Sequence, residues 1–296
     1  MKHTIKIIVA VCAIAAVLFH YDFNPINTPL PSVSSPEIQS NEDTTIHFID
    51  VGQGDAELVV SGDSAVLIDA GKKSAGDTVV NYLRHHNITK LDAIIASHPH
   101  EDHIGGLIDV FDAFDVEAIY MSDEATDTMI FEDLLDAIDA EGISPQFPEI
   151  GDTIPLGDSD AHFTVLAPGA DSRSHYSNDP NTWSLVVRLD AGGCSALFTG
   201  DTTTAVEKDM LSNNPVMLNC DILKVAHHGS RTSSNADFLQ AVSPKYAVIS
   251  YETGNSYGLP DEEIFERLTP LGTQILETAK QGSIALTLSN GKVVVQ

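Results

Sequence analysis

The chain has 296 residues and 43% of them are hydrophobic, so it is long enough and apolar enough to bury a core of its own. It carries 43 Asp and Glu residues against 15 Lys and Arg residues, which gives a formal net charge of −28. Because a field of this sign repels polyanions, the composition excludes a protein that grips a long nucleic-acid duplex through a basic surface. A small phosphodiester, or a brief encounter with single-stranded DNA, remains compatible with this charge, and salt would screen the repulsion.

The N-terminal segment differs in character from the rest of the chain. Lys2 and Lys6 accompany an apolar run over residues 7–19. The run has the length of a signal-peptide core and is shorter than the roughly 20 residues that span a bilayer. Because bulky residues follow it, we interpret residues 1–22 as either a signal peptide or an uncleaved signal-anchor. Residues 23–43, rich in Pro, Ser, Asn and Thr, predict a flexible tether, and the positive charge predicts that the following domain is exported.

Strand and helix patterns alternate along residues 44–296, which predicts one α/β domain. Apolar segments between Gly- and Asp-containing turns predict strands, and amphipathic segments predict helices. In the first half we expect strands at 45–49, 56–60, 65–68 and 91–97, and helices at 78–85 and 132–140. The second half repeats the order, with strands at 163–166, 185–189, 195–199 and 221–226, and a helix at 206–211. The last expected elements are strands at 246–250, 274–277, 283–288 and 293–295, and a helix at 261–268.

The loop after the predicted strand at 91–97 has the sequence His98-Pro99-His100-Glu101-Asp102-His103. Three imidazoles and a carboxylate thus stand together, and these are ligands that a borderline divalent metal prefers. Apolar spacing resumes at Ile104 and predicts a helix start, so the loop joins a strand to a helix, where open α/β sheets carry their chemistry. The run predicts a metal site, and a polar loop that is rich in His by chance is the alternative.

Two later predicted strands end in residues of the same kind. Asp201 follows the strand at 195–199, and His227 and His228 follow the strand at 221–226. Because strand ends of this type converge on one edge of an α/β sheet, we expect these side chains to meet the His loop. Such a set is sufficient for two divalent ions about 3.5–4 Å apart that share a carboxylate and activate a water. The expected ligands are His98, His100, Asp102, His103, Asp201 and one of His227 or His228.

The combination of His-x-His-x-Asp-His, a Gly-Asp after a strand and a late His resembles the metallo-β-lactamase superfamily. Four further segments resemble the hydrolase domain of the ComEC/Rec2 competence proteins and its stand-alone relatives, namely 47–56, 67–71, 197–201 and 224–230. The resemblance extends from about residue 45 to the C-terminus. It implies a four-layer αββα sandwich of two similar halves, in the α/β or α+β class. It also implies a hydrolase whose cofactors are two divalent metal ions, Zn²⁺ or Mn²⁺.

Two positions depart from the pattern of these relatives. The superfamily normally has a third His motif before the Gly-Asp, whereas the stretch 178–187 contains no His, and in this it is similar to the competence-type relatives. Asn181 is expected to stand in for that ligand, with a turn residue before a strand as the alternative. An amide oxygen is a harder and weaker ligand than imidazole, so Mn²⁺ is expected to be tolerated beside Zn²⁺. Where the relatives usually have Gly-His-Pro, this chain has Leu259, which cannot contact a phosphate or leaving group as that His would.

Several residues are expected to support the ligands or the substrate. Asp69 follows a buried strand and is expected to orient the His loop, with a turn cap as the alternative. Asp55 either faces the cleft or caps a turn. His227 comes directly off its strand and is therefore preferred as the ligand, with His228 standing behind it. Ser230 belongs to a polar loop that either binds an anion or has no role in binding.

Together these features predict an exported metal-dependent hydrolase of phosphoesters, with a ComEC-like phosphodiesterase or nuclease as the first choice. Asp102 is expected to orient the attacking water, and replacing Asp201 with Asn is expected to abolish activity without unfolding the domain. The expected partners are a phosphoester substrate, either single-stranded DNA or a cell-wall polymer, and a membrane at the N-terminus; the oligomeric state stays open.

Three alternatives to a nuclease remain. One is a cell-wall phosphoesterase that acts on teichoic acid or choline phosphate. Another is a lactamase-type amide or ester hydrolase, against which the missing third His counts. The last is a non-catalytic metal-binding module, against which Asp102 and Asp201 count, because a structural site needs no open water position.

Overall fold

The residues described by the computed structural model are 43–157, 159–169, 176 and 179–296. The expected signal segment at 1–22 and the tether, except its last residue, lie outside the described residues, so both remain predictions. Within the described ranges, we find no helix that combines the length and the apolar character needed to cross a bilayer.

The strands of the described residues form two seven-stranded sheets and one two-stranded ribbon. The first sheet contains the first strands of the domain and also the last two, which return from the second half of the chain to pair with β1. In spatial order its strands are β16 (Lys292–Val295), β15 (Ile284–Ser289), β1 (Thr44–Phe48), β2 (Glu57–Ser61), β3 (Ser64–Ile68), β5 (Ala93–Ala96) and β7 (Ile119–Met121). The strands from β16 to β3 are antiparallel, whereas β3, β5 and β7 are parallel.

The second sheet is built in the same way. In spatial order its strands are β14 (Gln274–Glu277), β13 (Tyr246–Ile249), β12 (Ile222–Lys224), β11 (Cys194–Phe198), β10 (Val186–Ala191), β9 (His162–Ala167) and β8 (Thr153–Pro155). β8 to β11 are antiparallel, and β11 to β14 are parallel. Each sheet therefore combines an antiparallel part with a parallel part, which gives the two similar halves. The ribbon consists of β4 (Lys90–Leu91) and β6 (Asp115–Val116).

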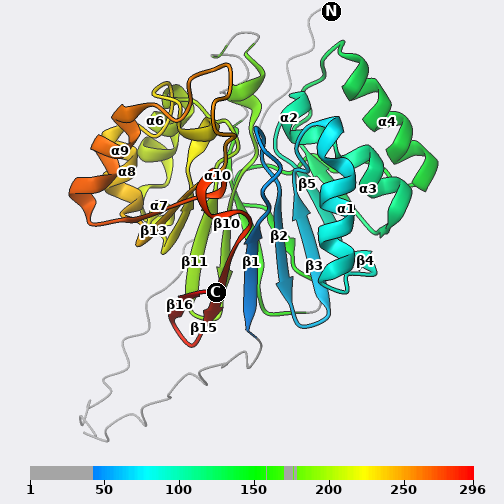
Figure 1. The fold of residues 1–296 in the computed structure, drawn as a ribbon, viewed down its shortest axis with the longest axis horizontal. Coiled ribbons are helices and arrows are strands. Elements are labelled where there is room, and N and C mark those ends of the chain that lie inside the picture. The colour runs from blue at the N-terminus through cyan, green and yellow to red at the C-terminus, as the bar shows by residue number, and fades with distance from the viewer. Residues whose placement is uncertain (1–42, 158, 170–175, 177–178) are drawn as a thin grey trace, which may run out of the picture. The chain divides into compact units, whose positions relative to one another are not determined.

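Helices cover the outer face of each sheet (Figure 1). On the first sheet these are α1 (Gly76–His85), α3 (Leu107–Ala113) and α4 (Met129–Glu141), and on the second they are α6 (Thr204–Asn213), α8 (Ala236–Val242) and α9 (Glu262–Leu268). Each group of helices buries its apolar side against its own sheet in a separate hydrophobic cluster. The shorter elements are α2 (Glu101–Ile104), α7 (Pro215–Leu218), α10 (Thr278–Gln281), and the 3-10 turns η1 (Lys73–Ala75), η2 (Pro180–Trp183), η3 (Ala226–Gly229) and η4 (Thr269–Leu271).

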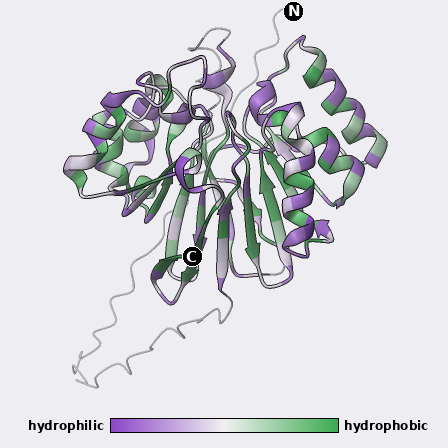
Figure 2. Ribbon diagram, in the orientation of Figure 1, coloured by the Kyte–Doolittle hydropathy of each residue, from purple (hydrophilic) through white to green (hydrophobic). Residues whose placement is uncertain are grey.

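A third hydrophobic cluster lies between the two sheets. Phe48 of β1 and Phe163 of β9 both pack against Phe198 of β11, with ring centroids 6.2 Å apart in each pair. The strands are correspondingly rich in hydrophobic residues, whereas the covering helices carry polar residues on their outer sides (Figure 2). This arrangement confirms the four-layer αββα sandwich, and it buries strands such as β5 on both faces.

The predicted strand at 91–97 is divided in the structure. Leu91 belongs to the ribbon, and β5 begins only at Ala93. Asp92 lies between the two, where its Oδ2 accepts a hydrogen bond from the amide of Ala65 at 2.7 Å. Asp92 therefore separates the pairing of β4 with β6 from the pairing of β5 with β3. The C-terminal end of β5 leads directly into the His loop.

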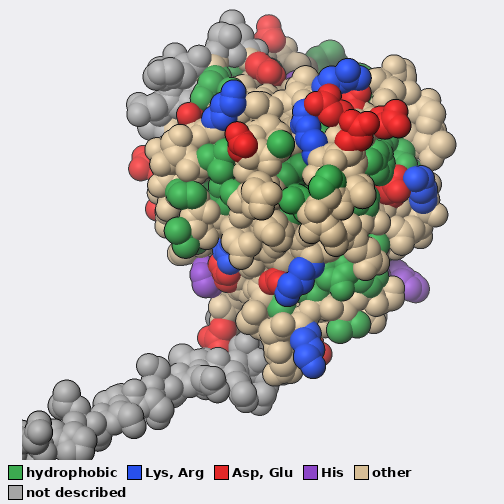
Figure 3. Space-filling model, turned by 90° about the vertical axis from the view of Figure 1, so that its left-hand side faces the viewer, with side chains coloured by type: hydrophobic (Ala, Val, Ile, Leu, Met, Phe, Trp, Pro, Cys, Tyr) green, Lys and Arg blue, Asp and Glu red, His purple; other side chains and the backbone are tan. Residues whose placement is uncertain are grey.

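Several cations of the described surface are used in local ion pairs. On the face formed by α6, α8 and α9, Lys and Arg side chains lie beside Asp and Glu side chains (Figure 3). Arg267 pairs with Glu263 at 2.6 Å, and Lys245 pairs with Asp221 at 2.8 Å. Such paired cations contribute little positive field to attract a polyanion.

Candidate metal centre

Strand ends from both sheets supply the side chains of the candidate centre. His98 follows β5, and His103 lies in the short helix α2, which begins at Glu101 within the His loop. Asp201 follows β11, and His227 and His228 lie in η3, directly after β12. The parallel strands β5, β11 and β12 thus bring residues far apart in the sequence to one edge of the sandwich, as the sequence pattern indicated.

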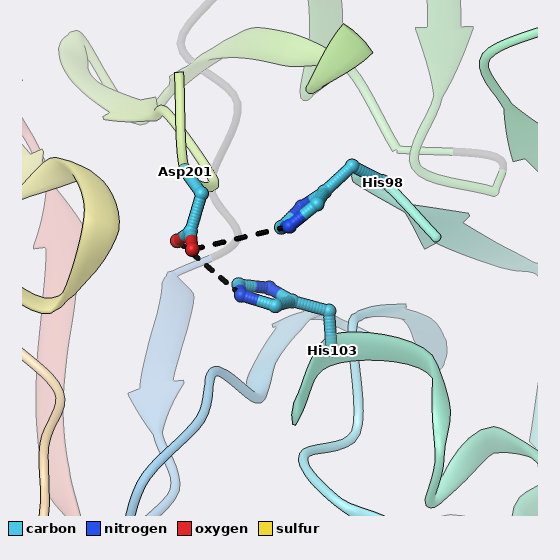
Figure 4. A group of neighbouring side chains, drawn as sticks. All are labelled: His98, His103 and Asp201. Atoms are coloured by element: carbon cyan, nitrogen blue, oxygen red, sulfur yellow. Dashed lines mark ion pairs between the residues drawn. The ribbon is translucent and has the colours of Figure 1, made fainter. Parts of the chain in front are cut away.

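A first group of potential ligands consists of His98, His103 and Asp201. All three side chains are buried, and their ligand atoms lie within 4.8 Å of one another. His98 Nε2 is 3.9 Å from Asp201 Oδ2, and His103 Nε2 is 3.3 Å from Asp201 Oδ1. Both rings point toward the carboxylate of Asp201 (Figure 4). His100 adjoins this group, because its Nδ1 is 3.0 Å from His98 Nε2.

A second group consists of Asp102, His103 and His228. His228 Nε2 is 3.5 Å from Asp102 Oδ2 and 3.7 Å from Asp201 Oδ2, so Asp201 lies between the two groups. His227 Nε2 is 3.6 Å from Asp201 Oδ2, but its side chain is 26% exposed and belongs to none of the described ligand groups. The geometry thus favours His228 over His227, in contrast to the preference drawn from the sequence.

The local backbone explains why the second of the two adjacent histidines enters the cluster. His227 and His228 have φ values of 53° and 52°, and both therefore lie in the left-handed region. Two successive residues of this kind turn the chain sharply after β12. His227, the first of the two, keeps a part-exposed side chain, whereas His228 turns into the cluster. The ring of His228 is buried, and its Nδ1 is 3.1 Å from the carbonyl oxygen of Ser250.

Asp69 supports the His loop from behind. Its Oδ2 accepts hydrogen bonds from His103 Nδ1 at 2.8 Å and from the Ser97 hydroxyl at 2.6 Å. Its Oδ1 accepts a hydrogen bond from the Ser97 amide at 2.8 Å. With Nδ1 of His103 held in this way, Nε2 is directed at the cluster, which is the usual arrangement behind a metal-binding imidazole.

Asp55 supports His228 and is itself held by a lysine. Its Oδ1 is 3.2 Å from His228 Nδ1, and its Oδ2 accepts a hydrogen bond from Lys224 Nζ at 2.6 Å. The Asp55 amide donates to the carbonyl oxygen of Asp102 at 3.1 Å, which ties this loop to the His loop. The sequence analysis assigned no role to Lys224 or Ser97. For Lys224 a signal was available, because it is a charged residue inside an otherwise apolar strand.

The remaining expected residues lie around these groups. Asn181 belongs to η2, and its Oδ1 is buried without a hydrogen-bond partner among the described residues. Ser184 follows in the same segment and accepts a hydrogen bond from the Asp201 amide at 3.1 Å. Ser230 is engaged by the Thr232 hydroxyl at 2.9 Å. The role of Asn181 as a metal ligand therefore stays a prediction. Leu259 lines the cavity in front of the cluster, so the cavity wall at this position is apolar.

The electrostatics of the cluster favour positive charge. Burial alone would lower the pKa of His228, but Asp201 and Asp55 outweigh it and raise that pKa to about 10. Burial likewise opposes a charged His103, yet Asp201 and Asp69 raise the pKa of His103 well above its usual value. Burial would raise the pKa of Asp201, but the two imidazoles lower it well below the usual range. The protein thus keeps cationic charge among ionised carboxylates at this place.

Several atoms of the cluster also lack hydrogen-bond partners among the described residues. His103 Nε2, His228 Nε2 and Asp201 Oδ1 are buried and make no hydrogen bond there. Buried polar atoms are normally satisfied, and both imidazole nitrogens lie within 3.7 Å of an Asp201 carboxylate oxygen. Imidazole nitrogens and carboxylate oxygens together form the donor set of a divalent metal centre, so the residues present fit such a metal.

A family model described as the metallo-β-lactamase superfamily matches residues 49–253. Among curated proteins, ComE operon protein 3 of Bacillus subtilis (strain 168) is 29% identical over 263 residues, which cover 83% of this chain and 33% of that protein. Competence protein ComA of Neisseria gonorrhoeae is 30% identical, covering 88% of this chain and 35% of that protein. Recombination protein 2 of Haemophilus influenzae is 26% identical, covering 85% and 30%. The chain therefore spans about a third of the length of these relatives.

Solved structures share the fold at low sequence identity. The metallo-β-lactamase fold protein YhfI from Bacillus subtilis has a TM-score of 0.56 and 13% identity, covering 83% of this chain and 99% of that one. CmlA, a diiron β-hydroxylase from Streptomyces venezuelae, has a TM-score of 0.54 and 11% identity, covering 84% and 54%. Since these two proteins are so distant in sequence, the likeness concerns the fold alone, and the chemistry must be argued from the residues.

Proposed function

This chain belongs to the metallo-β-lactamase superfamily of hydrolases, and from that membership and the geometry of its buried cluster we propose that it is a metal-dependent phosphodiesterase. The observation that carries the proposal is Asp201, whose carboxylate lies between two groups of ligands built on His98 and His103 and on Asp102 and His228. A carboxylate shared in this way is typical of a centre for two divalent ions, here Zn²⁺ or Mn²⁺.

Three carboxylates at the cluster have distinct tasks in the proposed reaction. Bound divalent ions would supply Lewis-acid stabilisation of charge on the phosphoryl oxygens and would lower the pKa of a water. Asp102 lines the cavity with a part-exposed side chain, where its carboxylate can orient the attacking water and accept its proton. Asp69 and Asp55 hold the rings of His103 and His228 in the orientation that metal binding requires.

A compact phosphoester is the proposed substrate class. The cavity in front of the cluster has a volume of about 280 Å³, and its described lining includes no Lys or Arg. Together with the net charge of −28, this favours one phosphodiester group over a long polyanion. The names of the relatives, which are competence and recombination proteins, support a phosphodiester of nucleic-acid type, such as a short single strand.

A cell-wall phosphoester is the second candidate, and one observation favours it. Glu101 and Tyr257 both line the cavity, and a carboxylate together with an aromatic ring suits a cationic group such as choline.

For either substrate, we propose that the domain acts outside the membrane and that the N-terminal segment associates it with the membrane. A substrate beyond the membrane would be reached by such an exported enzyme.

The test uses the full chain, purified without chelator, with bound metal measured by elemental analysis. We expect Mn²⁺- or Zn²⁺-dependent hydrolysis of bis-p-nitrophenyl phosphate, and a comparison with short single-stranded DNA and p-nitrophenylphosphocholine then ranks the substrate classes. Asp201→Asn should lower turnover on the order of 100-fold or more without unfolding the protein. Asp136→Asn, on the exposed side of α4, is the matched control. Hydrolysis of nitrocefin but of no phosphoester would overturn the proposal in favour of a lactamase.

A further inference from the structure

Gln53 is a buried side-chain amide at the candidate metal centre, and its donor end has no partner in the part of the chain that the structure describes. The residue is 3% exposed and lines the cavity that contains Asp102, Asp201 and His228. Its Nε2 makes no hydrogen bond among the described residues. Because an amide NH₂ carries two hydrogen-bond donors and buried donors are normally satisfied, the position calls for an acceptor that comes from a ligand.

The orientation of this amide follows from its other end. Gln53 Oε1 lies 3.4 Å from the backbone amide of Glu252, which donates to it. With the oxygen engaged in that direction, the nitrogen is the end of the amide that has no partner among the described residues. The donor is therefore presented by a fixed side chain rather than by a freely turning one.

The backbone that directly follows Gln53 is tied to the loop that carries the ligands. Gly54 has a φ of 149°, and a Cβ at this residue would lie 2.4 Å from the carbonyl oxygen of Asp102. The next residue, Asp55, donates its amide to the same oxygen at 3.1 Å. Glycine is thus required for close approach of the two loops, and this contact fixes the backbone next to Gln53 against the His loop.

The chemistry of the cavity indicates which acceptor Gln53 serves. The described lining carries the carboxylates of Glu101, Asp102 and Asp201, and it includes no Lys or Arg. At position 259 the wall offers only an aliphatic side chain. The amide of Gln53 is therefore a neutral donor in an otherwise acceptor-rich and metal-binding space, which suits an anionic oxygen that does not itself lie between the ligand groups.

We propose that Gln53 Nε2 donates a hydrogen bond to a non-bridging oxygen of the bound phosphoester and thereby orients the phosphorus for attack. The proposal rests on the proposed phosphodiesterase function and specifies how that site selects its substrate. A bound phosphodiester presents an anionic non-bridging oxygen to this donor, whereas a bound carboxylic ester presents a neutral carbonyl oxygen, which is the weaker acceptor. Gln53 therefore favours phosphoesters over carboxylic esters at the same metal centre.

The first test is a binding measurement that needs no turnover. Inorganic phosphate is titrated calorimetrically into the metal-loaded full chain and into Gln53→Met, which keeps the length of the side chain but removes the donor. We expect phosphate to bind about 10- to 100-fold more weakly to the variant, the loss typical of one hydrogen bond to a charged group. Gln274→Met, at the exposed first position of β14, is the matched control and should bind phosphate like the wild type. Equal phosphate affinity in Gln53→Met and the wild type would overturn the proposal.

The second test is kinetic and separates orientation from a structural role. We expect kcat/KM for a thymidine 5′-phosphodiester to fall about 10- to 100-fold in Gln53→Met, while hydrolysis of p-nitrophenyl acetate and metal content stay unchanged. The two phosphorothioate diastereomers of the diester sharpen the readout, because sulfur accepts hydrogen bonds poorly. The variant should lose little further activity on the diastereomer whose sulfur faces Gln53. An equal loss on both diastereomers, or on phosphate and acetate esters alike, would refute the assignment.

The two proposals fail in different ways. If the wild type binds phosphate through Gln53 but hydrolyses no phosphodiester, the proposed function is wrong, whereas the hydrogen bond from Gln53 to a phosphate oxygen is supported. If the wild type hydrolyses phosphodiesters and Gln53→Met does so equally well, the proposed function stands and the contact is wrong. Gln53→Glu provides a second variant of nearly the same shape, and its carboxylate should oppose phosphate more strongly than Met does. Thermal unfolding of each variant excludes a loss caused by misfolding.

Discussion

The ammonium nitrogen of Lys224 lies 2.6 Å from Oδ2 of Asp55, and each side chain is 1% exposed. Lys224 comes from β12 in the second sheet, whereas Asp55 lies in the loop between β1 and β2 of the first. The same carboxylate reaches His228 through its other oxygen at 3.2 Å. A buried ion pair thus joins the two halves of the sandwich directly behind the candidate metal centre. Removing one partner of such a pair leaves an uncompensated buried charge.

Lys224→Met should therefore destabilise the fold by roughly 3–5 kcal/mol, because Asp55 and the nearby Glu57 keep their burial but lose the cation. The free energy of unfolding from urea titration measures the effect. Lys245→Met is the control, since Lys245 is 68% exposed in its pair with Asp221 and should cost at most about 1 kcal/mol. The double variant Lys224→Met with Asp55→Asn should recover part of the loss. Equal stabilities of the two lysine variants would contradict the role of the buried pair.

Asp69→Asn should weaken metal binding without unfolding the protein. Asp69 accepts hydrogen bonds from His103 Nδ1 and from Ser97, so its loss frees the ring of His103 to turn away from the cluster. We expect the affinity for Zn²⁺, measured in competition with a chromophoric chelator, to fall about 10- to 100-fold. Asp136→Asn on α4 serves as the reference for a carboxylate that contacts no ligand. Unchanged Zn²⁺ affinity would mean that the His loop needs no support from Asp69.

His228→Ala and His227→Ala should differ in metal content. His228 approaches Asp102 and Asp201 within 3.7 Å and is buried, so its removal should cost one of two bound ions. His227 is part-exposed at the cavity mouth, and its removal should leave both ions bound while turnover falls. Elemental analysis after gel filtration distinguishes the two variants. The reverse result, with metal lost only from His227→Ala, would restore the assignment that follows from strand order.

Much of the fold was predictable because its strands are short apolar segments between turns. The strand expected at 195–199 corresponds to β11 (Cys194–Phe198), and the helix expected at 78–85 corresponds to α1 (Gly76–His85). β7 (Ile119–Met121) was not predicted, because three residues are too few for a periodic signal. α8 was also missed, although Asn235 caps it by accepting hydrogen bonds from the amides of Asp237 and Phe238, both at 3.1 Å. That cap was a readable signal in the sequence.

The site was predictable to the extent that its residues end strands. Asp201 and the His loop meet because parallel strands deliver their ends to one edge, which the order of elements already implies. The choice between His227 and His228 depends on two left-handed backbone positions, and no sequence period reports the directions of such side chains. The place of Lys224 depends on a contact with a residue 169 positions away, so it follows from the packing of the two sheets alone.

The stability of the domain should depend on pH through Glu207 of α6. Its buried carboxylate accepts hydrogen bonds from Ser234 and from the amide and side chain of Asn235, which fixes the loop after η3. Burial raises the pKa of Glu207 from 4.5 to about 7, against the opposing effect of these hydrogen bonds. The folded state therefore binds more protons than the unfolded state between these two values. Its contribution to stability is complete below the unfolded pKa and is lost as the pH rises through about 7.

We accordingly expect the free energy of unfolding of the wild type to fall between pH 5 and pH 8 by on the order of 3 kcal/mol more than that of Glu207→Gln. The glutamine does not titrate, so the variant should lack this component of the pH dependence whatever its absolute stability. Urea titrations at both pH values give the two differences. Glu266→Gln, on the exposed side of α9, should keep the pH dependence of the wild type. If Glu207→Gln loses as much stability with rising pH as the wild type, Glu207 is not the group that titrates. Its carboxylate would then already be ionised at pH 5, because the hydrogen bonds from Ser234 and Asn235 would outweigh its burial.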